Sequence, residues 1–451
     1  MSLSWSENLR GQLDLPLGKR QPLFMIFSIL IGIPLSMLWA FASSLRMRKR
    51  MKQNSAHSRT EPWMVSIGNV SVGGTGKSPV VRALARKALE DGFDVAVLSR
   101  GHGASTSSCS LIQLSGQDDA FLFAPPAGLW TSGFSDECLE HALVLGTTLK
   151  RNQTVWVAQA SNRAEAMSKL LEARQNTSNG KSEAPRLVVL LDDGLSQTSV
   201  PVHRDIVVWD PATVISAPRA AMPFGPYRMG WPGTMWSSSL PTADLVVWSR
   251  IVDDRRAAEF QELCQAARKV LGMATSTRSS LSEGGMLTGT QTPEFFAVEQ
   301  PRLARVNDNS PAHGFVLETV DARALMGSYS VLTGLARPHR FIATIMNLQR
   351  SQDNLSMELS NVESTQHLSD HGSLTPEAIA LLEKPGVVVT SLKDLCRWWG
   401  HDAVRRKMKK NLLYVLCLEV ELRPGFMENS LEAVSAILRP ETNVRSADGK
   451  R

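Results

Sequence analysis

A glycine-rich turn between an apolar run and an amphipathic segment constrains the fold of this chain more than any other feature. The turn SVGGTGK follows WMVSIGNV, a run typical of a buried strand, and precedes SPVVRALARKALEDG, whose apolar residues recur at helical spacing. The next apolar run, DVAVLSRG, predicts a second strand. Two strands joined by a helix within about 40 residues form a βαβ unit, and therefore a parallel sheet.

The same turn has the composition of a phosphate-binding loop. Its three glycines allow backbone N–H groups to turn inward around phosphate oxygens, and the following helix adds its positive N-terminus. Lys77 is expected to bridge the terminal phosphates, and the Ser78 hydroxyl to bind Mg²⁺. Ser71 stands where the usual pattern has its first glycine, so a plain glycine-rich turn is the alternative. The predicted ATP-binding residues are Ser71, Val72, Gly73, Gly74, Thr75, Gly76, Lys77 and Ser78.

Two adjacent aspartates end another predicted strand. The run RLVVLL is continuous and apolar, as expected of a strand buried on both faces, and it leads into Asp192, Asp193 and Gly194. Ligands of open α/β sheets bind at the carboxyl ends of the strands, and carboxylates suit Mg²⁺. Because neighbouring side chains point in different directions, one aspartate is expected to hold the metal and the other to orient water or the loop. A structural Asp-Gly turn is the alternative.

An uncharged run of 24 residues, Pro22 to Leu45, precedes the α/β region. As a helix it would be about 36 Å long, enough to cross a hydrocarbon core of about 30 Å. Gly32 and Pro34 in its middle predict a kink and an oblique insertion. We expect this run to anchor the chain in a membrane; a cleaved secretory signal and a buried helix of a soluble protein are the alternatives.

A basic cluster, Arg46 to Lys52, follows the uncharged run and carries five positive charges, almost the whole net charge of +6. Positive charge after a membrane helix predicts that the following domain lies on the cytoplasmic side, or on the matrix or stromal side of an organelle. The cluster also predicts contact with anionic lipid head groups. The rest of the chain is nearly neutral, which argues against a nucleic-acid-binding face.

These patterns predict an α/β protein with two folded parts and an N-terminal membrane helix. The larger part is a P-loop NTPase-like domain with a parallel sheet, and the smaller α/β domain closes over its site. Residues rich in Ser, Thr, Gly and Pro separate them. The expected boundaries are 1–21 for an N-terminal segment, 22–45 for the membrane helix, 46–61 for a basic juxtamembrane linker, 62–272 for the P-loop domain, 273–322 for a linker or insertion and 323–451 for the smaller domain.

The segment SIGNVSVGGTGKSPVVRALARKALEDGFDVAVLSRGHG resembles the tetraacyldisaccharide 4'-kinase family, which phosphorylates a lipid A precursor. In that family a residue other than glycine is normal at the position of Ser71. The resemblance continues through LDDG, FGPYR, LTGLARPHRF, SDHGSLT and LYVLCLEVEL, and covers most of the chain from Pro22 to about Leu438. It implies transfer of the γ-phosphate of ATP to the 4'-hydroxyl of a tetraacyldisaccharide 1-phosphate, forming lipid IVA.

The resemblance also implies roles for individual residues. Asp118 matches the family's catalytic base, and Asp119 stands where the family favours Glu; both would meet the acceptor sugar. His371 matches a histidine that supports the base from the smaller domain, and Arg100 and Arg228 match residues near the acceptor. A carboxylate within hydrogen-bond reach can take the proton of the attacking hydroxyl, and a histidine across the cleft can complete the site on closure. Lys77 completes the predicted catalytic set.

Some residues depart from the family pattern. Leu195, Ser196 and Gln197 follow Asp193-Gly194 where the family has Phe, Gln and His, and Met229 replaces a glutamate. Two other functions therefore stay open: a membrane-associated P-loop ATPase, and a catalytically impaired, lipid-binding relative of the kinase. No Asn-Lys-x-Asp stands in a fitting position, which disfavours GTP. The expected host membrane is the bacterial inner membrane or that of a eukaryotic organelle.

Overall fold

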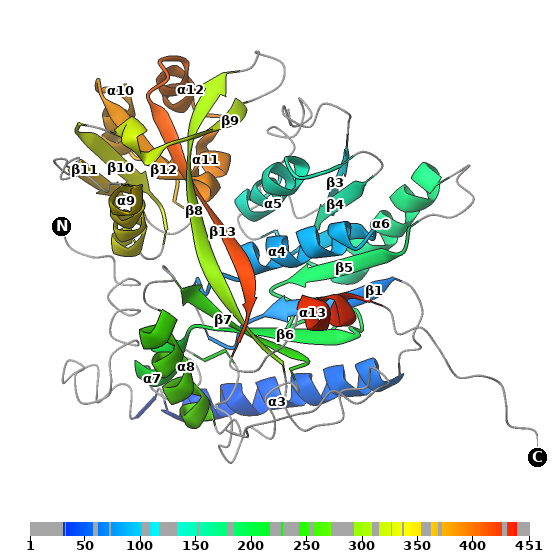
Figure 1. Cartoon of the computed structure of the whole chain (residues 1–451). Helices are drawn as coiled ribbons and strands as arrows, with labels where there is room; N and C mark the ends of the chain where they lie inside the picture. The colour runs from blue at the N-terminus through cyan, green and yellow to red at the C-terminus, as the bar shows by residue number, and fades with distance from the viewer. Residues whose placement is uncertain are drawn as a thin grey trace, which may run out of the picture.

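One twisted sheet of 13 strands runs through the described chain, with helices packed against it on both sides (Figure 1). Most neighbouring strands are parallel, so the predicted α/β class is confirmed. The computed structural model describes residues 30–31, 33–56, 62–71, 74–101, 109–116, 133–150, 153–178, 185–216, 227–228, 243–251, 257–271, 293–308, 315–325, 327–335, 338–352, 362–368, 372–425 and 431–439.

The strands around the glycine-rich turn form a parallel set with one antiparallel strand at its edge. In spatial order they are β7 (Leu245–Ile251), β6 (Arg204–Trp209), β1 (Trp63–Gly68), β5 (Leu187–Asp192), β2 (Asp94–Ser99), β4 (Thr154–Gln159) and the antiparallel β3 (Ser110–Ser115). The central strands β1, β5 and β2 are buried along their whole length. This burial on both faces explains why their sequences are almost continuously apolar.

The sheet continues without a break into the second half of the chain. The further strands, in spatial order, are β8 (Glu294–Asp308), β13 (Leu413–Pro424), β12 (Val387–Ser391), β10 (Tyr329–Thr333) and β11 (Val362–His367), while β9 (Phe315–Val320) pairs with β8 beside this path. β8 pairs in parallel with β7 and antiparallel with β13, so it joins the two halves. Residues 294–308 and 315–320, expected to belong to a linker, are therefore strands of the sheet.

The helices divide into two groups by the apolar cores that they cover. One core is shared by α4 (Lys77–Glu90), α5 (Asp136–Gly146), α10 (Pro376–Glu383), α11 (Leu392–Trp398), α12 (Asp402–Lys409) and α13 (Leu431–Leu438). The other helices lie on separate apolar clusters, and they are α6 (Arg163–Ser178), α7 (Pro211–Ser216), α8 (Ala257–Leu271), the 3-10 turn η5 (Ala322–Leu325) and α9 (Pro338–Gln352). Since the first core contains helices from both predicted domains, the two halves are packed together rather than tethered.

The N-terminal helix α3 (Ile33–Ala56) lies along the edge of the molecule beneath β6 and β7 (Figure 1). The guanidinium of its buried Arg50 donates two hydrogen bonds to the Asp205 carboxylate at the start of β6. Asn54 accepts a hydrogen bond from the main-chain N–H of Val202 at 2.9 Å. These contacts fix the basic end of α3 on the core. Residues 46–56, expected to be part of a linker, belong instead to this helix.

The uncharged run also differs from its expected form. The helix begins at Ile33, so Pro34 falls in its first turn, where the missing N–H has no helical partner to lose. Gly32 and residues 22–29 lie outside the described residues, so the kink expected at Gly32 and Pro34 stays a prediction. Among the helices described, none is both long enough and apolar enough to cross a bilayer. One side of α3 nevertheless exposes large apolar side chains, namely Leu35, Met37, Leu38, Trp39, Phe41 and Leu45.

Candidate functional site: a nucleotide site beside an arginine-lined cavity

The glycine-rich turn lies between the carboxyl end of β1 and the N-terminus of α4, where a phosphate-binding loop has to lie. Gly76 is the N-cap of α4 and has a φ of +77°, a left-handed conformation that glycine adopts without a Cβ clash. Lys77 and Ser78 are the first two residues of the helix. Val72 and Gly73, predicted to line the loop, lie outside the described residues.

The Lys77 ammonium is held on the loop by two neighbours. It donates a hydrogen bond to Asn69 Oδ1 at 2.8 Å, and it lies 3.6 Å from Asp193 Oδ1. Asn69 in turn donates from its amide nitrogen to the main-chain oxygen of Ser71 at 2.7 Å. Asn69 therefore connects the beginning of the loop to its lysine. No sequence pattern indicated a role for Asn69, although Asn69 directly follows β1.

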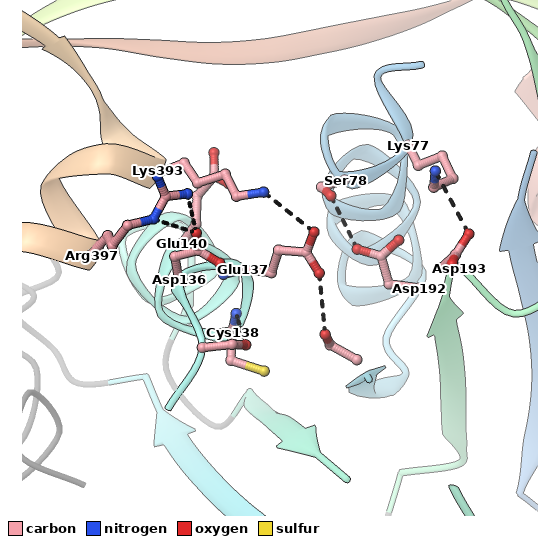
Figure 2. Close-up of polar contacts among 12 residues, drawn as sticks. Lys77, Ser78, Asp136, Glu137, Cys138, Glu140, Asp192, Asp193, Lys393 and Arg397 are labelled. Atoms are coloured by element: carbon pink, nitrogen blue, oxygen red, sulfur yellow. Dashed lines mark hydrogen bonds and ion pairs between the residues drawn. The ribbon is translucent and has the colours of Figure 1, made fainter. Parts of the chain in front are cut away.

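Asp192 lies at the carboxyl end of β5, buried beside the start of α4. Its Oδ2 accepts hydrogen bonds from the Ser78 hydroxyl at 3.1 Å and from His141 Nε2 at 2.9 Å, and Arg163 donates to its main-chain oxygen. Burial by itself raises the pKa of Asp192, but His141, together with the nearby Lys77 and Ser78, lowers that pKa below its usual range. The side chain is therefore an ionised carboxylate next to the loop serine (Figure 2).

Asp193 points elsewhere, because it lies in the turn after β5 with a left-handed φ of +53°. Its Oδ2 accepts a hydrogen bond from Arg228 at 2.7 Å, and its Oδ1 faces Lys77. Burial opposes ionisation, yet the two cations lower the pKa of Asp193. A Cβ atom added at Gly194 would lie only 2.8 Å from Leu191 Cβ, so this turn requires glycine. The two aspartates thus contact different partners within one tight turn.

The residues that depart from the family pattern after Gly194 are accommodated by packing. Leu195 is almost fully buried, and a Cβ built on Gly68 would approach its side chain to 2.7 Å. Gln197 accepts a hydrogen bond from the main-chain N–H of Ser199 and donates one to the main-chain oxygen of Val200. These side chains therefore stabilise the loop after β5. Met229 lies outside the described residues.

The predicted base Asp118, its neighbour Asp119 and the supporting His371 lie outside the described residues. Another acidic pair, Asp136 and Glu137, begins α5 at the same edge of the sheet. This pair keeps the literal Asp-Glu of the family pattern, whereas Asp118 is followed by a second Asp. The Asp-Glu pair itself was the signal in the sequence that could have identified Asp136 and Glu137 as candidates.

Two cations from α11 contact this acidic pair (Figure 2). Lys393 Nζ lies 3.5 Å from Glu137 Oε1, and the Ser99 hydroxyl lies 3.5 Å from Glu137 Oε2. The Arg397 guanidinium donates to the buried Asp136 carboxylate from Nε at 3.1 Å and also pairs with Asp394 at 3.0 Å. These ion pairs join the first turn of α5 to the second half of the chain, so they hold the smaller half against the nucleotide site.

A cavity of about 290 Å³ opens between α3 and the loop after β5. Arg100 lines it and donates a hydrogen bond to the Ser196 hydroxyl at 2.7 Å. Trp39 of α3 donates from its indole N–H to the main-chain oxygen of Arg228 at 2.7 Å, which fixes this wall of the cavity. The charged side chains that line the cavity are Arg46, Arg50, Arg100, Arg228 and Asp193. Arg50 is already paired with Asp205, so the other three arginines and one carboxylate leave a net positive charge suited to an anionic group.

The arginine-lined cavity and the nucleotide site share a wall. Asp193 contacts Lys77 on one side and Arg228 on the other. The main-chain N–H of Arg228 also donates to Val70 at 2.7 Å, just before the glycine-rich turn. A group bound in the cavity would therefore lie beside the terminal phosphates of a nucleotide bound on the loop.

Comparisons with known proteins agree on one family. A family model described as Tetraacyldisaccharide-1-P 4'-kinase matches residues 29–436. The tetraacyldisaccharide 4'-kinase of Chlorobaculum parvum is 25% identical, with 83% of this chain and 84% of that protein covered. The corresponding kinase of Chlorobium phaeobacteroides is 25% identical, with 88% and 93% covered. The crystal structure of the "apo" form of LpxK from Aquifex aeolicus in complex with ATP has a similar fold, with a TM-score of 0.55, 18% identity, and coverage of 90% of this chain and 98% of that one.

Proposed function

Since this chain belongs to the tetraacyldisaccharide 4'-kinase family and has that kinase activity in lipid A biosynthesis, we propose how its residues transfer the γ-phosphate of ATP to the 4'-hydroxyl. The observation that carries the proposal is the wall shared by the phosphate-binding loop and the arginine-lined cavity. The donor phosphate and the acceptor lipid can then meet at Asp193. Phosphoryl transfer needs mainly such positioning and charge neutralisation.

We propose that ATP binds with Mg²⁺ at Ser78 and Asp192. The donor set fits this ion, because a hydroxyl oxygen and an ionised carboxylate lie side by side at the loop. Among the described residues no group of three His, Cys, Asp or Glu side chains forms a metal cage, and Mg²⁺ bound with nucleotides typically takes only one or two carboxylates. When bound, the ion would neutralise charge on the phosphates. Lys77 and the backbone N–H groups of the loop would hold the phosphate oxygens.

We propose that the cavity between α3 and the core receives the disaccharide of the acceptor lipid. Its arginines suit the 1-phosphate, since a guanidinium binds phosphate through paired hydrogen bonds. Arg100 directly follows β2, and Arg228 lies between α7 and β7, where it pairs with Asp193. The acyl chains would then extend along the exposed apolar side of α3.

This arrangement supports association with a membrane surface. The exposed apolar residues of α3 include Leu38 and Phe41, while Arg50 on the opposite side is buried against the core. A helix with one apolar and one anchored side lies along a bilayer surface more readily than across it. We propose that α3 rests on the anionic leaflet of a bacterial inner membrane, or of an organelle, with the catalytic site on the cytoplasmic or stromal side.

The proton of the attacking hydroxyl needs an acceptor. The resemblance assigns this base to Asp118, supported by His371, whereas the contacts of the described residues favour the acidic pair of α5. Glu137 is only half-buried, pairs with Lys393 (Figure 2) and contacts the Ser99 hydroxyl at the carboxyl end of β2, the strand next to β5. Asp136 is buried and holds Arg397. We propose that Glu137 faces the reacting groups while Asp136 secures closure of the smaller half over them.

The base is testable by three isosteric variants measured side by side. We expect Glu137→Gln to lower kcat by about 10²-fold or more, within the range of a lost general base, and Asp118→Asn to stay within about threefold of the wild type. Asp136→Asn should lower kcat by weakening the ion pair with Arg397 that secures closure. Steady-state kinetics with saturating ATP and acceptor provide the measurement. The opposite order, with the large loss in Asp118→Asn alone, would return the base to the position that the resemblance implies.

The kinase reaction itself is tested with purified protein, labelled ATP and tetraacyldisaccharide 1-phosphate. We expect labelled lipid and an equal amount of ADP, both dependent on the acceptor. ADP release that does not need the acceptor would support the ATPase alternative. If neither lipid product nor ADP forms, the impaired lipid-binding relative is the better description.

A further inference from the structure

His141 is fully buried on α5 and has no role in the function proposed above. His141 follows Glu137 by four residues on α5. Its imidazole reaches across to β5, where Nε2 lies 2.9 Å from Asp192 Oδ2. The contact joins positions 51 residues apart, which explains why no local pattern reveals it.

The surroundings of the ring indicate which nitrogen carries the proton. Nδ1 is buried and has no hydrogen-bond partner among the described residues. A proton on Nδ1 would be a buried donor without an acceptor, whereas a bare Nδ1 leaves only an unused lone pair. A proton on Nε2 avoids that loss and is donated directly to the Asp192 carboxylate.

This hydrogen bond fixes the orientation of Asp192. The Ser78 hydroxyl ends on the same oxygen, Oδ2, so two donors from two different helices hold one side of the carboxylate. Arg163 holds the main-chain oxygen of the same residue at 2.6 Å. The carboxylate cannot rotate without breaking contacts to α4 and α5, and its other oxygen keeps a constant direction relative to the loop.

We propose that His141 is a positioning residue that aligns Asp192 for the Mg²⁺ that accompanies ATP; the proposal rests on the metal role proposed above for Asp192. Hydrogen bonds from outside the ligand set commonly determine how a carboxylate presents itself to a metal. The imidazole touches neither nucleotide nor acceptor and acts only through the carboxylate.

The test compares two amide variants that differ only in reach. His141→Gln places an amide N–H near the position of Nε2, whereas the amide of His141→Asn is too short to reach Asp192. The affinity for a non-hydrolysable ATP analogue is measured by calorimetry with saturating Mg²⁺ and again with EDTA. We expect His141→Asn to lose about 10-fold to 100-fold of the affinity gained from Mg²⁺, and His141→Gln to keep most of it. With EDTA all the proteins should bind the analogue alike.

A buried residue of the same helix controls for general damage. Leu145→Ala removes apolar packing in α5 without touching Asp192, so it should lower the melting temperature and leave the gain from Mg²⁺ unchanged. The proposal is overturned if His141→Asn keeps the full gain, or if its affinity falls equally with Mg²⁺ and with EDTA. The proposed function is tested separately by acceptor-dependent ADP release from the wild type. If no ADP is released, the binding experiments still show whether His141 affects the gain in affinity from Mg²⁺.

Discussion

Replacing Lys77 by alanine is expected to lower the rate of phosphoryl transfer by about 10²-fold to 10³-fold, the usual cost of removing one preorganised donor to developing charge. The ammonium is the cation of the glycine-rich loop and is already aligned there by Asn69 and Asp193. Its loss removes charge neutralisation at the terminal phosphates and one of the two cations that offset the Asp193 carboxylate. The measurement is acceptor-dependent formation of labelled lipid from labelled ATP at saturating concentrations.

The same helix offers a matched control for this variant. Lys87 lies in the last turn of α4 and pairs with Asp91, at the end of the helix away from the loop. Lys87→Ala removes the same charge from the same helix, so it should keep the activity of the wild type. Equal rates of lipid phosphorylation by Lys77→Ala and the wild type would contradict a catalytic role for the loop lysine.

Asp192→Asn is expected to cause a comparable loss, of at least about 10²-fold in kcat. The substitution keeps the shape of the side chain and removes the negative charge that the nearby Lys77 and His141 maintain. An amide is a poor ligand for Mg²⁺ compared with a carboxylate. The concentration of Mg²⁺ needed for half-maximal activity should therefore rise as well, which a titration of the metal at saturating ATP measures.

Asp91→Asn serves as the control, because Asp91 is a carboxylate in an ion pair with Lys87 remote from the site. It should leave both kcat and the Mg²⁺ requirement unchanged. A different result would remove Asp192 from the metal site: if Asp192→Asn kept its kcat within about threefold and needed no more Mg²⁺ than the wild type, Asp193 would be the better candidate for that role.

The resemblance and the local patterns predicted the nucleotide half of the molecule well. A strand, a glycine-rich turn and a helix follow each other directly in the sequence. The apolar periodicity and the glycines that favour these elements involve only residues that are near each other in the chain. The position of Asp192 at the end of β5 follows from the same reasoning, since a continuous apolar run followed by acids is typical of a buried strand end. These predictions needed no knowledge of distant contacts.

The uncharged N-terminal run shows what such reasoning leaves out. Hydropathy alone describes how apolar a segment is, and it favoured a membrane helix from Pro22 to Leu45. The described helix starts at Ile33 and includes the basic cluster, because Arg50 finds a buried partner in Asp205. A positive charge that pairs on the core becomes an anchor for the helix, and only the folded chain reveals the partner.

The sequence by itself therefore determined the α/β class, the strand, glycine-rich turn and helix around Lys77, and the family, because these depend on residues that are close together in the chain. Tertiary structure alone decided which side chains meet across it. It brought His141 to Asp192 and Arg397 to Asp136, and it merged two expected domains into one sheet through β8 and β13. The physical reason is that a buried charged or polar group needs a hydrogen-bonding or oppositely charged partner. That partner can lie far away in the chain, where the local sequence pattern does not identify it.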